Sequence, residues 1–152
     1  MRSLTFIFFI VISLITVSCG NSQNKEIEAA LSERDHAIET KDADLYMTLI
    51  SPDYNVEENS KVIGIEEVKK QFLSNVTLFD DLKVTHANRS IYERDNKIEV
   101  VQLTVVDASV NETKSRFKVN EKIQFEKIDG KWLIVKDSDA DYLERFVFGG
   151  SN

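Results

Sequence analysis

The side chains that could do chemistry in this sequence are few: one cysteine, two histidines and scattered carboxylates. Two histidines and one cysteine are too few for a conventional zinc site, and the acids show no spacing typical of metal ligands. No serine lies in a nucleophile elbow, and no glycine-rich loop is suited to binding phosphate. The sequence therefore predicts neither a metal nor a bound cofactor. Acid/base chemistry and plain binding remain the open functions.

The cysteine, Cys19, directly follows an apolar run that has one charge, Arg2, near its start. Residues 1–18 contain no acid, and the apolar run is shorter than the roughly 20 residues that span a membrane. The apolar run, the small residue Ser18 and then Cys19 together resemble the lipobox of bacterial lipoprotein signal peptides. The resemblance implies cleavage before Cys19 and acylation of its sulfur. The alternative is an ordinary secretory signal followed by a chance cysteine.

A lipid anchor has a defined physical consequence, because two or three acyl chains at about 0.8 kcal/mol per buried CH₂ hold a soluble domain on a bilayer. We therefore expect residues 1–18 to be the signal peptide and residues 19–25 to be the lipidated cysteine and a polar tether. The partner is then the membrane, reached through the N-terminal anchor. Gly20 after the cysteine, in place of aspartate, favours the periplasm-facing outer membrane of the cell envelope.

The charge of the chain excludes one class of partner. The 152 residues carry a formal net charge of −7, and removing residues 1–18, whose only charge is Arg2, leaves −8. Nucleic-acid binding needs clustered lysine and arginine, and no such cluster is visible. The length predicts one domain, over residues 26–141, followed by a tail over residues 142–152.

The first half of this domain has the periodicity of helices. Apolar residues recur at helical spacing through roughly 25–41, and the pattern resumes after Asp42, a natural N-cap. Pro52 ends this second helix, and a short strand is expected at 54–56. Gly64, followed by two acids, predicts the start of a third helix because acids in the first turn suit the helix dipole.

From residue 82 the period changes to two, which predicts strands. Alternation assigns two faces to the first strand: Val84, His86, Asn88, Ser90 and Tyr92 on one, and Thr85, Ala87, Arg89 and Ile91 on the other. Further strands are expected at 98–110, at 117–125 and, after the Asp129-Gly130 hairpin signal, at 132–135, where Trp132 enters the core. Three helices followed by a four-strand meander predict an α+β fold, with helices on one side of a curved antiparallel sheet.

Four segments in this order resemble the nuclear transport factor 2-like (NTF2-like) superfamily, of the SnoaL-like and DUF4440 type. They are residues 37–45, the Ser-Pro-Asp-Tyr of 51–54, Gly64 before Ile-Glu-Glu-Val, and residues 125–132. The resemblance covers about 26–138. It implies a cystatin-like cone of three N-terminal helices packed on a strongly curved antiparallel sheet, with a pocket opening between them. It also implies that homodimers through the sheet face are possible.

That superfamily contains ketosteroid isomerase as well as non-catalytic association domains, so its fold does not determine function. The resemblance implies that Glu58 takes the position of the isomerase base and Glu121 that of its oxyanion-hole acid. The third position, a tyrosine in the isomerase, is Arg34 here. The isomerase acid must be protonated to donate, whereas a nearby Arg34 would keep Glu121 ionised and lower its pKa. An Arg34–Glu121 ion pair is expected instead of an oxyanion hole.

The candidate pocket residues share a polar group and a predicted position near the opening of the cone. They are Arg34, Tyr46, Tyr54, Glu58, His86, Gln102 and Glu121. Gln102 lies in an apolar run, where a buried amide needs hydrogen-bond partners. His36 and His86 are a further, dehydratase-like candidate pair, although His86 also fits a half-buried sheet position.

These residues leave three hypotheses for the function. The leading one is a cell-envelope lipoprotein whose pocket domain binds a small apolar ligand or a protein without catalysis. The alternative is a pocket enzyme that does acid/base chemistry on a small apolar substrate with Glu58 and Glu121. The third is a dimeric structural protein with an apolar sheet face and little cavity.

Overall fold

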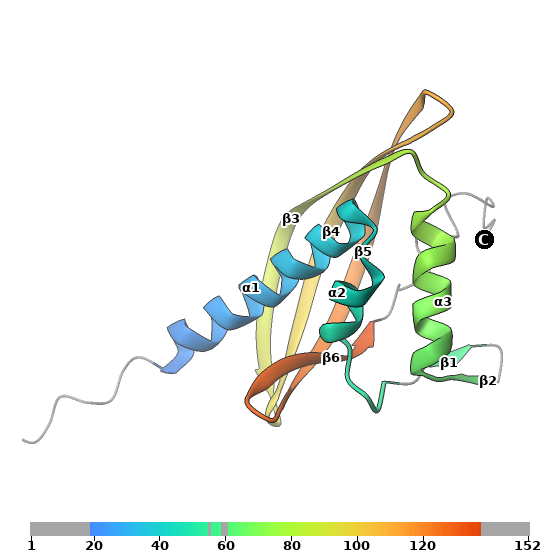
Figure 1. Cartoon of the computed structure of the whole chain (residues 1–152). Coiled ribbons are helices and arrows are strands. Elements are labelled where there is room, and N and C mark those ends of the chain that lie inside the picture. The colour runs from blue at the N-terminus through green and yellow to red at the C-terminus, as the bar shows by residue number, and fades with distance from the viewer. Residues whose placement is uncertain (1–18, 55, 59–60, 138–152) are drawn as a thin grey trace, which may run out of the picture.

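The computed structural model describes residues 19–54, 56–58 and 61–137 (Figure 1), so the expected signal peptide and C-terminal tail lie outside it. Three helices and six strands occur in this part of the chain. In order they are α1 (Cys19–Thr40), α2 (Ala43–Thr48), β1 (Val56–Glu58), β2 (Lys61–Ile63), α3 (Ile65–Val76), β3 (Asp81–Arg94), β4 (Lys97–Val110), β5 (Thr113–Ile128) and β6 (Lys131–Asp137).

The four long strands form one antiparallel sheet in the order β3-β4-β5-β6, and all three helices lie on the same side of it (Figure 1). This arrangement confirms the predicted α+β fold and its meander. The short strand expected near residue 54 occurs as β1, and β2 pairs with it as a separate hairpin that the sequence pattern did not reveal.

Helix α1 begins at Cys19 and not near residue 25, so the stretch 21–24 that was expected to be a tether is helical. No proline or internal glycine interrupts the sequence between Gly20 and the buried residue Ile27, and the helix therefore continues toward its N-terminus. At its other end the chain turns into α2. Asp42 caps that helix as predicted, because its carboxylate accepts from the backbone N–H of Leu45 at 2.9 Å.

Helix α2 ends at Thr48, several residues before Pro52. The reason is tertiary, since the backbone after the helix pairs with β6. Ser51 N–H donates to the Ile134 carbonyl at 2.9 Å, and Ile134 N–H donates to the Leu49 carbonyl at 2.8 Å. These bonds replace the next helical turn and join the helical half of the chain to the last strand of the sheet.

The core lies between the helices and the inner face of the sheet. On β4 every second residue from Ile98 to Ala108 is buried, and Ile123 and Phe125 on β5 are fully buried. Asp129 and Gly130 both have positive φ, 50° and 83°, as the predicted two-residue hairpin requires. Trp132, expected in the core, is only partly buried at its edge.

One predicted face assignment is wrong because β3 contains a bulge. Ala87 pairs with Leu103 and Ser90 pairs with Val101, so two residues of β3 lie opposite a single residue of β4. Asn88 has φ 54°, in the left-handed region that asparagine tolerates. The extra residue reverses the alternation beyond it. Arg89 and Ile91 therefore lie on the inner face with His86, and Ser90 and Tyr92 lie on the outer face.

Candidate functional site

A polar patch interrupts the apolar inner face of the sheet. Gln102 and Thr104 are successive inward positions of β4, and Glu121 on β5 is the direct cross-strand partner of Gln102. All three are at most 1% exposed. Gln102 donates to Oε2 of Glu121 at 2.9 Å, and the Thr104 hydroxyl also donates to this oxygen. The amide expected to need partners therefore has one in the neighbouring strand.

Arg34 of α1 covers this patch with a buried positive charge. Its Nη2 donates to Oε1 of Glu121 at 2.8 Å and to Oδ2 of Asp137, at the end of β6, at 2.9 Å. The side chains of all three are at most 1% exposed. Burial raises the pKa of Glu121, but the Arg34 charge and the bonds from Thr104 and Gln102 outweigh it, so the pKa lies below its usual value. Glu121 is therefore ionised, and the predicted ion pair is present.

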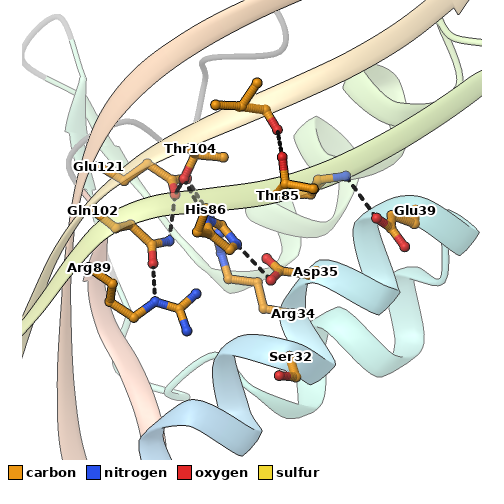
Figure 2. A network of polar contacts seen from close by, with 12 residues as sticks. Ser32, Arg34, Asp35, Glu39, Thr85, His86, Arg89, Gln102, Thr104 and Glu121 are labelled. Atoms are coloured by element: carbon orange, nitrogen blue, oxygen red, sulfur yellow. Dashed lines mark hydrogen bonds and ion pairs between the residues drawn. The ribbon is translucent and has the colours of Figure 1, made fainter.

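His86 of β3 links the patch to α1 (Figure 2). Its Nδ1 lies 2.9 Å from the Thr104 hydroxyl, and its Nε2 lies 2.7 Å from Oδ2 of Asp35. Both ring nitrogens of His86 are therefore engaged within the network, one by a hydroxyl of β4 and one by a carboxylate of α1. Its side chain is 11% exposed and that of Asp35 is 17% exposed.

The same network continues along the contact between α1 and β3. Arg89 Nε donates to Oε1 of Gln102 at 2.7 Å. Its Nη1 donates to the carboxylate of Glu28, which precedes Asp35 on α1. Farther along α1, Glu39 accepts from the backbone N–H of Val84 at 2.7 Å. The network thus joins α1 to β3, an edge strand of the sheet. It also gives the backbone N–H of Val84, on that edge, a hydrogen-bond acceptor.

Two buried tyrosines, Tyr46 and Tyr54, lie near Arg34. Burial raises the pKa of the Tyr46 phenol to about 12, against the opposing effect of the Arg34 charge. Burial, and then the neighbouring Tyr46, raise the pKa of Tyr54 above its usual range. Tyr46 also stacks on Phe72 of α3, with ring centroids 4.2 Å apart. Both tyrosines are therefore neutral hydrogen-bonding groups and contribute to the core.

Comparison with known proteins identifies the fold. No protein-family profile matches the chain, and no curated protein matches it either. Solved structures do. An NTF2-like superfamily protein from Salmonella enterica serovar Typhimurium has a TM-score of 0.69 at 16% identity, covering 78% of this chain and 90% of the other. The chain has the NTF2-like fold.

Two further solved structures similar to this chain are candidate dehydratases. One, from Streptomyces avermitilis, has a TM-score of 0.68 at 12% identity, covering 78% of this chain and 94% of that one. The other, a candidate scytalone dehydratase from Novosphingobium aromaticivorans, has a TM-score of 0.64 at 13% identity, covering 78% and 83%. The structural similarity establishes the NTF2-like fold. At sequence identities this low it does not transfer a function to this chain.

The NTF2-like fold brings together four of the predicted site residues: Arg34, His86, Gln102 and Glu121 belong to one hydrogen-bonded network. The side chain of Glu58 lies outside the described residues, so its expected partnership with Glu121 stays a prediction. His36 is exposed on α1, and its carbonyl bonds Thr40, whereas the partner of His86 is Asp35. His86 is therefore paired with Asp35, and the predicted pair of His36 and His86 does not form.

The sequence did not predict six members of the network: Thr104, Asp35, Asp137, Arg89, Glu28 and Glu39. Thr104 had a signal, because it follows Gln102 at the strand period of two and so shares its face. Asp35 and Asp137 had none, since only the packing of α1 on the sheet places them beside His86 and Arg34. Arg89 was assigned to the opposite face, and the bulge in β3 is what turns it inward.

The arrangement limits the chemistry available. Within the described residues, each acid and base of the network bonds another member of it: both oxygens of Glu121 accept, and both ring nitrogens of His86 are engaged. In residues 19–54, 56–58 and 61–137 no group of three histidine, cysteine, aspartate or glutamate side chains is placed to hold a metal ion. None of the helices described here has the length and apolar character needed to span a bilayer.

Proposed function

We propose that this chain is a lipid-anchored protein of the bacterial cell envelope whose NTF2-like domain works by binding and not by catalysis. The observation that carries the proposal is the buried network around Arg34. A catalytic acid or base must exchange protons with a substrate, whereas the carboxylates and the imidazole here are hydrogen-bonded to other members of the network. Their arrangement is that of a structural ion-pair network.

The comparison with ketosteroid isomerase chemistry supports this view. An oxyanion hole needs a neutral carboxylic acid, which an apolar site provides by raising its pKa. Glu121 is instead held ionised by Arg34, at 2.8 Å. A carboxylate cannot donate a hydrogen bond to a developing enolate. Arg34, at the position of the isomerase tyrosine, therefore prevents Glu121 from acting as an oxyanion-hole acid.

The surface open to a partner in this proposal is the outer face of the sheet. Tyr92 on β3 and Val101 on β4 are 46% and 37% exposed, respectively, on neighbouring strands. A second copy of the chain and a small apolar ligand are the two partners we propose to test. Native mass spectrometry of the protein purified from its own membranes detects either, as a doubled mass or as a co-purified adduct.

Substitution of the two candidate catalytic carboxylates tests whether the protein is an enzyme. Glu58→Gln and Glu121→Gln are introduced on the chromosome and compared with a gene deletion, after checking that each variant accumulates and unfolds cooperatively. A binding module retains the wild-type phenotype in both variants. A folded variant that reproduces the deletion phenotype would overturn the non-catalytic proposal.

The anchor has an independent test at Cys19. Metabolic labelling with an alkyne analogue of palmitate is expected to label the wild-type protein and not Cys19→Ala. Globomycin, which inhibits lipoprotein signal peptidase, is expected to leave a longer precursor. A wild-type protein that takes up no label and keeps its size under globomycin contradicts lipidation. Fractionation of the envelope then tests the proposed outer-membrane location.

One observation favours a second candidate, a pocket enzyme doing acid/base chemistry on a small apolar substrate. Asp35 and His86 form a pair at the partly exposed edge of the network, and an acid–histidine pair is a common general base. For this reaction a nitrogen of His86 would have to leave Asp35 or Thr104. His86→Gln, scored by the same phenotype with exposed His36→Gln as the control, distinguishes the two candidates.

A further inference from the structure

We infer that the end of the domain carrying the β5–β6 turn faces the bilayer and is held there by a contact between α1 and that hairpin. This inference rests on the proposed lipid anchor at Cys19. The contact, here called the Glu26 clamp, consists of Glu26, Lys127 and Trp132. It goes beyond the anchor because it determines which part of the domain the membrane covers and which part remains accessible.

The geometry of the clamp is specific. Oε2 of Glu26 on α1 accepts from Nζ of Lys127 at 2.9 Å and from the indole Nε1 of Trp132 at 2.9 Å. The Lys127 ammonium also lies 5.5 Å from the centre of the Trp132 ring. Immediately after the clamp Ile27 and Leu31 are fully buried, so α1 is fixed to the domain from this point onward.

The chain between the anchor and the clamp is short. Cys19 and Glu26 are seven residues apart. As the helix described here they span about 10 Å, and even fully extended they would span no more than about 25 Å. The clamp therefore cannot lie far from the headgroups to which an acylated Cys19 would be fixed.

The topology then orients the rest of the domain. The β3–β4 and β5–β6 turns lie at the same end of the meander as the start of α1, and the β4–β5 turn lies at the opposite end (Figure 1). The 14 residues of β4 separate the two ends by about 45 Å. The outer sheet face and the β4–β5 turn consequently remain accessible to a partner.

The charge of this end is compatible with an anionic surface. The segments that form it are 25–26, 93–97 and 126–131, and they contain five basic and five acidic side chains. The formal charges of these segments therefore cancel, whereas the whole chain has a net charge of −7. The acidic excess thus lies elsewhere, where anionic lipid headgroups repel it less.

Fluorescence from a single tryptophan tests the orientation, because Trp132 is the only tryptophan of the chain and lies in the clamp. The full lipidated protein is reconstituted into phosphatidylcholine vesicles that contain dansyl-labelled lipid, and energy transfer from tryptophan to dansyl is measured. The control is the double variant Trp132→Phe with Val110→Trp, which moves the donor to the β4–β5 end and keeps the Glu26–Lys127 ion pair of the clamp. Flotation of the vesicles shows whether the protein is bound.

The expected result is several-fold greater loss of donor emission from position 132 than from position 110. Inserting 20 Gly/Ser residues between Asn24 and Lys25 adds about 25 Å of reach and is expected to remove most of the difference. Equal or reversed transfer from the two positions in floating protein would overturn the orientation and leave lipidation intact. Protein that does not float with vesicles overturns the anchor, and with it the orientation.

Discussion

Replacing Arg34 with methionine removes the only positive charge that directly contacts Glu121 among the described residues, while keeping a long apolar side chain in its place. The change leaves Glu121 and Asp137 buried, at 1% and 4% exposure, without their shared cation. Removing one partner from a buried ion pair costs about 3–5 kcal/mol. A domain of this size has about 5–15 kcal/mol of total stability, so Arg34→Met is expected to remove about a fifth of it or more.

The loss should depend on pH. In the wild type the pKa of Glu121 is lowered, so its ionised form stabilises the fold above the ordinary value of 4.5, and this contribution disappears as the pH falls. In Arg34→Met the same burial acts without the arginine, and the carboxylate becomes costly as the pH rises above its unfolded value. The stability difference between the two proteins is therefore largest near neutral pH and shrinks toward pH 4.5.

Urea unfolding followed by Trp132 fluorescence measures this difference at both pH values. The control is Arg116→Met, because Arg116 bonds Asp107 at 2.6 and 3.0 Å on the surface, where water screens the pair. Little change is expected for that variant. A loss below about 1 kcal/mol for Arg34→Met at pH 7, or a loss that does not shrink on acidification, would refute the assignment of Glu121 as a buried carboxylate stabilised by Arg34.

Three further substitutions test the fold and the network. Asp42→Ala removes the cap on Leu45 N–H and is expected to cost about 1 kcal/mol, read as a lower thermal midpoint in circular dichroism; an unchanged midpoint would contradict the cap. Phe125→Ala empties a fully buried position and is expected to cost about 3–5 kcal/mol in urea unfolding, and a cost below 1 would mean that the strand face is misassigned. His86→Leu breaks two hydrogen bonds at a cost of about 1–3 kcal/mol by calorimetry, whereas exposed His36→Leu is expected to be neutral; equal effects would argue against the network.

Much of the fold could be predicted from local patterns, because those patterns reflect burial on one face of each element. The period of two from residue 82 onward predicted the long strands, and Asp129-Gly130 identified a turn that needs two positive φ angles. Local patterns failed where tertiary contacts decide. Helix α2 ends early because its exit pairs with β6, and the bulge in β3 turns Arg89 inward.

The candidate site shows the same division. The sequence placed Arg34 and Glu121 as an ion pair through a resemblance in order and spacing, and it marked Gln102 as a buried amide that needed partners. It could not supply Asp35 or Asp137, since nothing local distinguishes these acids from the many on the surface. Packing α1 against the sheet removes Asp35 and Asp137 from water. Once desolvated, their charges need a partner, and their ion pairs then affect the stability of the fold.

The sequence by itself determined the three helices, the four long strands and their order, and the acidic charge that argues against nucleic acid. It also carries the cysteine motif on which the proposed anchor depends. Only the tertiary structure decided what the polar residues do, because a hydrogen bond between α1 and a strand more than 50 residues later requires distances that no local pattern encodes. The internal partners that the fold gives Glu121 and His86 are the support for the proposal of binding without catalysis.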